Sequence, residues 1–442
     1  MFGTSGIRGI YGKEITEDLA SKVGNIFAKE GEKFVIGRDI RNSGRWLFRA
    51  LSDGILAKGA TIIDLGIVPT PTVAFATLKY NCRGIMITAS HNPEEFNGLK
   101  FIESGKEIDK ELEKEIENKY KENRVFKSNK KGEIIQDEKI VDFHIEKILE
   151  QIDAKAVKEK TPKIVVDSNG AAAVITPKLL RKLGAKVFEI NNDLEKFRRP
   201  SEPNDANISE LKEFVVIKGA DFGIAHDGDG DRCIIVDENG ETLHFDTQLS
   251  IMIENELERE KMPIKQTVIS TVESSISIRE IIEKSGNKIE ITPVGSTYIG
   301  DKMSEVGACF GGEPCGEYVF SYGVHLPDAQ MAAAKFTEIF CKKGKFSVLK
   351  QKYKQYPILR EKFKTQKDKY QIVEKIREEI SKKYDKKQMR TDDGIRIDES
   401  DGWFLIRASG TEPLIRLTCE YKTQNELNSK SSQIKQLILK NI

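Results

Sequence analysis

Three copies of one strand–turn–helix–strand pattern follow one another along this chain. Each copy starts with a short apolar strand and continues into a helix. Its second strand begins at a glycine, a residue that suits the left-handed backbone conformation with which helices often end. Short strands that alternate with helices favour α/β layers, in which helices cover both faces of a sheet. The pattern therefore predicts three related α/β domains, with the copies at residues 34–64, 163–189 and 266–291.

The last part of the chain has a different order of elements. Helices are expected near residues 369–384 and 424–441, with short strands between them. This order is typical of an α+β domain. The length of 442 residues also fits several domains of ordinary size. We predict four domains, at residues 1–153, 154–245, 246–356 and 357–442.

Three aspartates at alternate positions, Asp227, Asp229 and Asp231, form the strongest local motif. Glycines separate them, and apolar segments that we interpret as strands flank the group at residues 220–225 and 233–236. Like charges about 4 Å apart repel by on the order of 4 kcal/mol at an effective dielectric near 20. A cation would offset that cost, and all-oxygen ligands favour a hard ion such as Mg²⁺ or Ca²⁺.

Two other interpretations of this motif remain open. In an EF-hand loop the aspartates would take positions 1, 3 and 5, but the sixth position would require glycine and is Arg232. The flanks would also be helices, whereas here they are β-like. The second alternative is an acidic turn exposed to solvent.

A serine stands at the end of another predicted strand. The apolar run at residues 84–88 leads directly to Ser90, and Pro93 disfavours helix at Asn92. Open α/β sheets bind ligands at the carboxyl ends of their strands. Ser90 is thus a candidate nucleophile or phosphate carrier, and His91 and Lys100 are possible helpers, because a free serine needs activation. Ordinary turn formers would give the same sequence.

Two further loops carry polar groups. The segment 407–413 offers arginine and hydroxyl side chains around a glycine, which suits a clamp for phosphate or carboxylate; a plain turn is the alternative. The glycine-rich segment 311–317 carries two glutamates that could accept hydrogen bonds from sugar hydroxyls, or it is a structural turn. We interpret its Cys315 as an unreactive thiol, because no histidine is adjacent.

Composition excludes several classes of partner. Basic and acidic residues nearly cancel, 71 against 70, and acidic residues interrupt most basic runs, as on a solvated face. No apolar run approaches the roughly 18 residues of a membrane helix, and the first residues have no signal-peptide pattern. The six cysteines form no Cys-x-x-Cys pair. We expect a cytoplasmic protein, a monomer or homodimer, without nucleic-acid or membrane partners.

Taken together, the motifs closely resemble the α-D-phosphohexomutase family. The resemblance covers the whole chain, with the motifs in the family's order at residues 3–9, 88–93, 227–232, 312–316 and 407–413. It implies four domains around a central cleft, the first three sharing one α/β fold with mixed sheets. It also implies one Mg²⁺ per chain, a hexose phosphate substrate, and a hexose bisphosphate as intermediate and activator.

The resemblance also implies roles for single residues. Ser90 is similar to the family's phosphoserine. When phosphorylated it would join Asp227, Asp229 and Asp231 as a Mg²⁺ ligand. Arg8, His91, Lys100 and Arg232 match residues around the transferring phosphoryl group, with the lysine as general acid/base. Glu313 and Cys315 match positions of the sugar-binding loop. The clamp for the phosphate that does not react is matched by Arg407, Ser409, Gly410, Thr411 and Arg416.

Within the family the chain is most similar to phosphoglucosamine mutases of archaeal type, on residues 219–225 and 294–298. The sugar loop departs from the common pattern, because Cys315 stands where serine is usual and Glu317 where histidine is frequent. Phosphomannomutase/phosphoglucomutase activity is therefore the alternative prediction. A phosphosugar phosphatase and a non-catalytic sugar-phosphate sensor are further ones.

Overall fold

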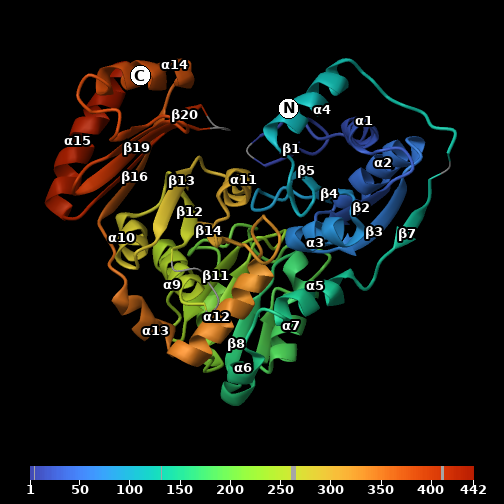
Figure 1. Cartoon of the computed structure of the whole chain (residues 1–442), viewed down its shortest axis with the longest axis horizontal. Helices are drawn as coiled ribbons and strands as arrows, with labels where there is room; N and C mark the ends of the chain where they lie inside the picture. The colour runs from blue at the N-terminus through green and yellow to red at the C-terminus, as the bar shows by residue number, and fades with distance from the viewer. Residues whose placement is uncertain (4, 131, 260–264, 410–412) are drawn as a thin grey trace.

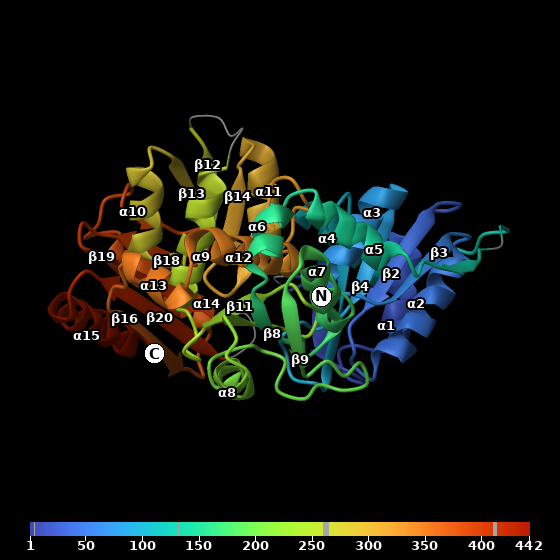
Figure 2. The ribbon, with the colours of Figure 1, turned by 90° about the horizontal axis from the view of Figure 1, so that it is seen from below.

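The protein consists of four domains arranged in an arc. This computed structural model describes residues 1–442 except 4, 131, 260–264 and 410–412. Figure 1 shows the first domain in blue and the last in red at the two ends of the arc, with the second and third between them. Seen from below, the domains follow one another along the long axis of the molecule (Figure 2). Among the described residues, no helix combines the length and apolar character needed to cross a bilayer.

Domain I is a mixed sheet with helices on both faces. Its strand order is β1-β5-β4-β2-β3-β7, with β6 paired to β5. One core packs α1, α2 and α4 against one face, and a second core packs α3 and α5 against the other. The strands are β1 (Ile7–Ile10), β2 (Lys33–Arg38), β3 (Thr61–Ile67), β4 (Arg83–Ile87), β5 (Phe96–Glu103), β6 (Lys106–Glu107) and β7 (Ile134–Gln136). The helices are α1 (Glu17–Phe27), α2 (Gly44–Ala57), α3 (Thr70–Tyr80), α4 (Lys110–Lys121) and α5 (Ile140–Leu149).

Domains II and III repeat the central part of this sheet. Their strand orders are β11-β10-β8-β9 and β13-β12-β14-β15. Domain II contains α6 (Ala154–Lys160), β8 (Lys163–Asp167), α7 (Thr176–Leu183), β9 (Lys186–Ile190), α8 (Ser209–Ile217), β10 (Phe222–His226) and β11 (Cys233–Asp237), with a 3₁₀ turn at Ala171–Val174. Domain III contains α9 (Phe245–Leu257), β12 (Thr267–Thr271), α10 (Ile276–Lys284), β13 (Lys288–Thr292), α11 (Ser296–Val306), β14 (Phe310–Glu313), β15 (Glu317–Phe320), α12 (Ala329–Lys343) and α13 (Phe346–Leu349), with a 3₁₀ turn at Lys350–Lys352.

Four strands of each of these three sheets have the same order and direction: β2 to β5 in domain I, β8 to β11 in domain II and β12 to β15 in domain III. The first strand pairs in parallel with the second and third, and the fourth strand pairs antiparallel with the third. The predicted triplication of one α/β fold is therefore confirmed. The connection between the third and fourth strands carries a polar motif in every copy: the serine loop (residues 88–95), the aspartate loop (residues 227–232) and the glutamate loop (residues 313–317).

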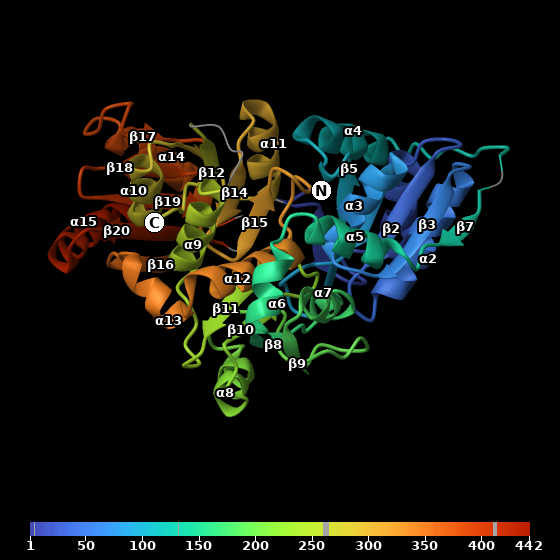
Figure 3. The ribbon, with the colours of Figure 1, turned by 60° about the horizontal axis from the view of Figure 1, so that its bottom comes forward.

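Domains II and III share one hydrophobic core. Phe222 of β10 packs against Phe340 and Phe346 of the α12–α13 segment, and the core continues to Phe310 of β14. Helix α12 contacts α6 and α7 of domain II as well as β15 of domain III, and Figure 3 shows it beside α6 and α7. These two domains are thus held together by apolar packing, the dominant favourable term in folding.

Domain IV is an antiparallel sheet with helices on one face, which confirms the predicted α+β class. Its strand order is β16-β20-β19-β18-β17, and its core lies between the sheet and the two helices. The elements are β16 (Ile358–Lys364), α14 (Lys369–Ile380), β17 (Met389–Arg390), β18 (Ile395–Asp398), β19 (Gly402–Ala408), β20 (Leu414–Tyr421) and α15 (Gln424–Asn441). The boundaries given above for all four domains stay predictions.

Helix packing in domain I generates a stability prediction. A Cβ atom at Gly54 of α2 would lie 1.9 Å from the backbone oxygen of Ser21 in α1, whereas at Gly44 of the same helix the nearest atom is 3.7 Å away. Alanine is the better helix former by about 1 kcal/mol, but overpacking costs about 1–3 kcal/mol or more. We expect Gly54→Ala to lower the thermal midpoint of unfolding, measured by calorimetry, and Gly44→Ala to leave it unchanged or raise it. Equal midpoints for the two variants would contradict this packing argument.

Candidate active site

The aspartate loop places three carboxylates around one point. Oxygens of Asp227, Asp229 and Asp231 lie within 4.8 Å of one another, and all three residues are buried. Burial and the charges of Asp231 and Asp229 raise the pKa of Asp227 well above its usual value. The Oδ1 atoms of Asp229 and Asp231 are buried and accept no hydrogen bond. Buried carboxylate oxygens without partners are costly unless a cation satisfies them, so this donor set fits a hard metal ion.

Neighbouring elements fix the shape of this loop. Thr70, at the start of α3, donates its hydroxyl to Asp229 Oδ2 at 2.6 Å and its backbone N–H to the Asp229 carbonyl oxygen at 2.9 Å. From domain III, Gln330 Nε2 donates to the carbonyl oxygen of Gly230 at 3.0 Å. The loop therefore depends on contacts with domains I and III for its conformation.

Lys100 supplies a positive charge to the same cluster. It projects from β5, and its Nζ lies 2.6 Å from Asp231 Oδ2 and 2.9 Å from Asp229 Oδ2. Burial alone would lower the pKa of Lys100, but the two aspartates raise it above the usual range. Burial alone would raise the pKa of Asp229. The charge of Lys100 and the hydrogen bonds from Thr70 and Lys100 outweigh burial, so the pKa of Asp229 lies below its usual value. Lys100 thus keeps its proton at Nζ and its positive charge beside the two carboxylates.

Ser90 meets the aspartate loop directly. Its Oγ donates to Asp227 Oδ2 at 2.8 Å and lies 3.4 Å from Nδ1 of His91. Ser90 has a backbone φ of 50°, a left-handed conformation that costs a non-glycine residue about 1–2 kcal/mol. The positive charge of Arg232, together with burial and Arg8, lowers the pKa of His91 to about 2. His91 is therefore neutral near pH 7.

Two arginines complete this part of the site. Arg8 lies on β1, opposite Gly98 of β5, and its buried Nε–H has no hydrogen-bond acceptor. Arg232 ends the aspartate loop, and its Nε donates to Glu317 Oε1 at 3.2 Å. Guanidinium groups suit phosphate because their donors form a planar fork. The structure thus brings together the predicted residues Ser90, His91, Lys100, Arg8, Arg232 and the three aspartates.

The glutamate loop adjoins this cluster through the Arg232–Glu317 contact. Glu313 and Glu317 are direct cross-strand partners in the β14–β15 hairpin, and Glu313 Oε1 accepts the N–H of Gly295 at 3.0 Å. Burial and Glu317 raise the pKa of Glu313 well above its usual value. Burial and Glu317 also raise the pKa of the Cys315 thiol, which agrees with an unreactive cysteine.

The predicted anion clamp lies in domain IV and contacts domain III. Arg407 of β19 pairs with Asp393 at 2.9 Å and with Glu273 of domain III at 3.0 Å. Arg416 of β20 is its direct cross-strand neighbour, and Ser409 follows the end of β19. Two arginines side by side on one sheet suit an anion. The predicted clamp residues Gly410 and Thr411 lie outside the described residues.

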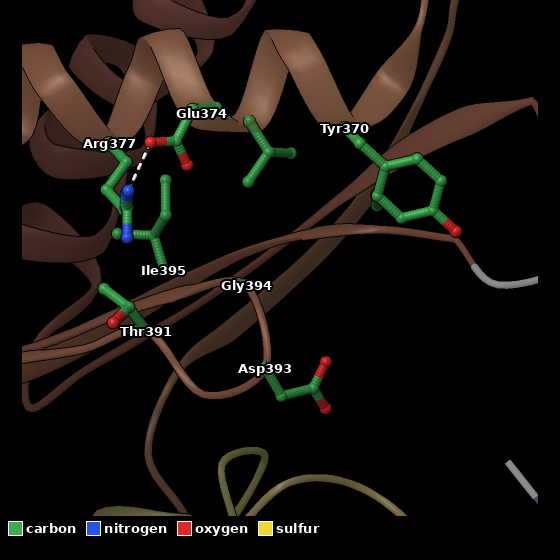
Figure 4. A pocket seen from close by; sticks show the side chains of 9 residues that line it. Tyr370, Glu374, Arg377, Thr391, Asp393, Gly394 and Ile395 are labelled. Carbon is green, nitrogen blue, oxygen red and sulfur yellow. Dashed lines mark hydrogen bonds and ion pairs between the residues drawn. The ribbon is translucent and has the colours of Figure 1, made fainter. Parts of the chain in front are cut away.

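A pocket of about 270 Å³ adjoins this cluster in domain IV. Figure 4 shows it between α14 and the turn before β18, with Asp393 on that turn and the ion pair of Glu374 and Arg377 on the helix. Val373, Ile395 and Ala408 line part of its wall. The pocket is thus next to the Arg407 contacts and belongs to the fourth domain alone.

Comparison with known proteins decides the family. Models of the four domains named phosphoglucomutase/phosphomannomutase match in order: α/β/α domains I, II and III at residues 1–126, 142–240 and 245–356, and the C-terminal domain at residues 361–436. The chain belongs to the phosphoglucomutase/phosphomannomutase family. It is therefore a phosphohexomutase, an isomerase that acts on sugar phosphates, as the motifs predicted.

Curated relatives of this phosphohexomutase have two different names. A probable phosphoglucosamine mutase of Methanosphaera stadtmanae is 38% identical, covering 97% of this chain and 96% of the relative. A phosphoglucomutase/phosphomannomutase of Thermococcus kodakarensis is also 38% identical, covering 96% and 95%. The relatives thus agree on the family and differ on the sugar.

Solved structures show the same fold. A phosphoglucomutase/phosphomannomutase family protein of Burkholderia thailandensis superimposes with a TM-score of 0.87 at 24% identity, covering 99% of this chain and 97% of that one. An N-acetylphosphoglucosamine mutase of Aspergillus fumigatus, in complex with GlcNAc-6P and magnesium, has a TM-score of 0.61 at 15% identity, covering 100% and 95%.

Several residues that no sequence motif marked support the loops of this site. Arg41 contacts the serine loop and the first residue of β5: its guanidinium donates to the carbonyl oxygens of Ser90, Asn92, Pro93 and Phe96. Thr70 and Gln330 hold the aspartate loop, and no local motif marks them. The one available signal is that Arg41 and Thr70 follow the ends of strands β2 and β3, where ligand sites gather.

The Lys100 contacts generate a second prediction. Lys100→Gln leaves two buried carboxylates without their cation, and breaking a buried pair costs about 3–5 kcal/mol. We expect a large fall in thermal midpoint in a metal chelator and a smaller fall with Mg²⁺ present, measured by scanning fluorimetry. The matched control is Lys106→Gln, which removes a half-exposed pair with Asp301 worth about 1 kcal/mol or less. Equal losses in chelator and Mg²⁺ would show that the metal ion does not substitute for the Lys100 charge.

Proposed function

We propose that this phosphohexomutase interconverts glucosamine 6-phosphate and glucosamine 1-phosphate through a phosphoserine at Ser90 and a glucosamine bisphosphate intermediate. The observation that carries the proposal is the 2.8 Å contact between Ser90 Oγ and Asp227 Oδ2 within a buried triplet of carboxylates. Phosphoryl transfer needs positioning and charge neutralisation more than covalent help. The groups around Ser90 Oγ are suited to both positioning and charge neutralisation.

Asp227, Asp229 and Asp231, with the phosphate on Ser90, would hold one Mg²⁺ per chain. Bound there, the ion would neutralise charge on the transferred group. The orphaned Oδ1 atoms of Asp229 and Asp231 support this assignment. Arg8 and Arg232 would bind the phosphoryl oxygens, and Lys100 would serve as the general acid and, once deprotonated, as the base.

The phosphoryl group passes from the Ser90 oxygen to a sugar hydroxyl, which gives the bisphosphate. Lys100 would give its Nζ proton to the released Ser90 oxygen and take up the proton of the sugar hydroxyl, so that the protons balance over the step. The intermediate then turns over, so that its other phosphate faces Ser90. Arg407, Ser409 and Arg416, with Gly410 and Thr411, would hold the phosphate that does not react, in place of the present Arg407 contacts with Glu273 and Asp393. Arginine and hydroxyl groups would bind the phosphate anion and not the sugar ring, so they suit either phosphate of the bisphosphate.

The opposed carboxylates of Glu313 and Glu317 favour an amino sugar. They are direct cross-strand partners, a costly arrangement for like charges. The N–H of Gly295 donates to Oε1 of Glu313, and Arg232 donates to Oε1 of Glu317. Neither Oε2 atom is a buried atom that lacks a hydrogen-bond partner. The ammonium group of glucosamine would offset this charge better than a neutral hydroxyl. The name of the Methanosphaera stadtmanae relative agrees with this substrate.

Mannose or glucose phosphates are the second candidate. The name of the Thermococcus kodakarensis relative favours them, and Cys315 and Glu317 change the hydrogen-bonding groups of the sugar loop. A phosphatase with the same site would release inorganic phosphate, whereas a mutase retains it on Ser90. A sensor would neither transfer nor release it.

The role of Ser90 is tested by intact-mass measurement and an isomerase assay. We expect the protein incubated with Mg²⁺ and glucose 1,6-bisphosphate to carry one phosphoryl group, and Ser90→Ala to carry none. Isomerisation should fall at least about 10³-fold in Ser90→Ala, because a nucleophile is lost. Ser400→Ala, at an exposed site, is the control. Isomerisation that persists in Ser90→Ala would contradict the mechanism.

Sugar preference is tested by a parallel assay of glucosamine 6-phosphate, mannose 1-phosphate and glucose 1-phosphate with Mg²⁺ and a bisphosphate primer. We expect the highest kcat/KM with glucosamine 6-phosphate. Glu317→Gln should reduce its advantage over the neutral sugars by about tenfold, the equivalent of one charge-assisted contact of about 1.4 kcal/mol. Because the kcat/KM values are compared as a ratio between sugars, a general loss of activity caused by breaking the Arg232–Glu317 contact cancels. An unchanged ratio would contradict the role of Glu317 in sugar choice.

A further inference from the structure

Ser201 connects the serine loop of domain I to the aspartate loop of domain II. Its hydroxyl donates to the carbonyl oxygen of Ser90 at 2.7 Å and accepts the backbone N–H of Gly228 at 2.9 Å. The residue is 4% exposed, so water does not compete freely for these bonds. One hydroxyl group thus links the main chain of the proposed nucleophile to the main chain between two proposed metal ligands.

The loops approach each other closely at this junction. A Cβ atom on Gly228 would lie 2.6 Å from Ser201 Oγ, 3.0 Å from the Ser90 carbonyl oxygen and 3.0 Å from the ring of Phe197. Only glycine leaves room for this approach. The position of Ser201 therefore affects both loops at once.

The segment that carries Ser201 is fixed to domain II. Asn169 Oδ1 accepts the N–H groups of Arg198 and Arg199 at 2.8 and 3.2 Å. The Arg199 side chain donates to Asp167 Oδ2 and to the His226 carbonyl oxygen, both at 2.7 Å. Because β8 and β10 end at Asp167 and His226, the segment is tied to the two strands that support the aspartate loop.

Ser90 requires such support. Its left-handed backbone conformation persists only if the surroundings hold it. Arg41 holds the carbonyl oxygen of Ser90 from within domain I, with an Nη2 distance of 2.8 Å, and Ser201 holds the same oxygen from domain II. Beside this junction, His91, Pro93 and Glu94 on one side and residues 197–202 and 207 on the other line a cavity of about 530 Å³. Ser201, one of the lining residues, thus contacts the serine loop directly beside a cavity between that loop and its own segment.

We propose that Ser201 is a positioning residue for phosphoryl transfer, because its hydroxyl sets the distance between the Ser90 loop and the carboxylate triplet. This proposal rests on the proposed function of Ser90 and adds a residue to it. Small displacements of reacting groups reduce rates strongly even when substrate binding is unaffected. The expected loss therefore lies in the transfer step and not in KM.

The test uses the full chain and measures the single-turnover rate at which glucose 1,6-bisphosphate phosphorylates Ser90 in the presence of Mg²⁺. We expect Ser201→Ala to lower this rate by about 10- to 100-fold, as for the loss of a buried hydrogen-bonding group. KM for the hexose phosphate should change by no more than about twofold. Ser201→Thr, which keeps the hydroxyl, should recover most of the rate. Ser201→Cys, with a weaker donor of similar size, should lie between the two.

Ser209→Ala is the matched control, because Ser209 is exposed at the start of α8. Thermal midpoints of all variants are measured in parallel. A parental transfer rate in Ser201→Ala would overturn the proposal, and so would equal losses in the Ala and Thr variants. If the unmodified protein takes up no phosphoryl group, the proposed function of Ser90 fails and this proposal falls with it. If the unmodified protein is phosphorylated and Ser201→Ala is phosphorylated at the same rate, only the proposed role of Ser201 is overturned.

Discussion

The repulsion among three buried carboxylates is the constraint around which the site is organised. Asp227, Asp229 and Asp231 share one loop, and Lys100 from another domain brings a positive charge to two of them. Two carboxylate oxygens still accept no hydrogen bond. Since an uncompensated buried charge is strongly destabilising, the loop depends on its contacts with neighbouring domains, and its donor set fits a metal ion. Function and domain assembly therefore depend on the same electrostatic balance.

The repeated fold explains how three domains contribute to one centre. In each α/β domain the third and fourth strands form an antiparallel pair, and their connection carries the serine, aspartate or glutamate loop. The Ser90–Asp227 and Arg232–Glu317 contacts join these equivalent connections in space. The chemistry thus differs between copies, whereas the position in the fold is the same. This is the pattern expected when loops carry function on a conserved scaffold.

The domains differ in how firmly they are joined. Domains II and III share one apolar core, whereas domain IV has its own core and contacts domain III through a small apolar cluster and polar pairs such as Arg407–Glu273. Polar pairs can exchange partners at little cost, and a substrate phosphate could replace Glu273 beside Arg407. This contrast suits the proposed mechanism, in which a bisphosphate turns over within the site.

The sequence by itself determined the elements and the principal chemical groups. Apolar periodicity predicted the copy at residues 163–189, where β8 and α7 lie, and the alternating aspartates indicated a metal site, because both signals are local. Strand β16 was missed because its exposed edge weakens the pattern. Only the tertiary structure placed Thr70, Arg41, Gln330 and Ser201 at the loops. Their partners lie far away in the chain, and a hydroxyl or a guanidinium becomes a positioning group only when folding brings it within hydrogen-bond distance.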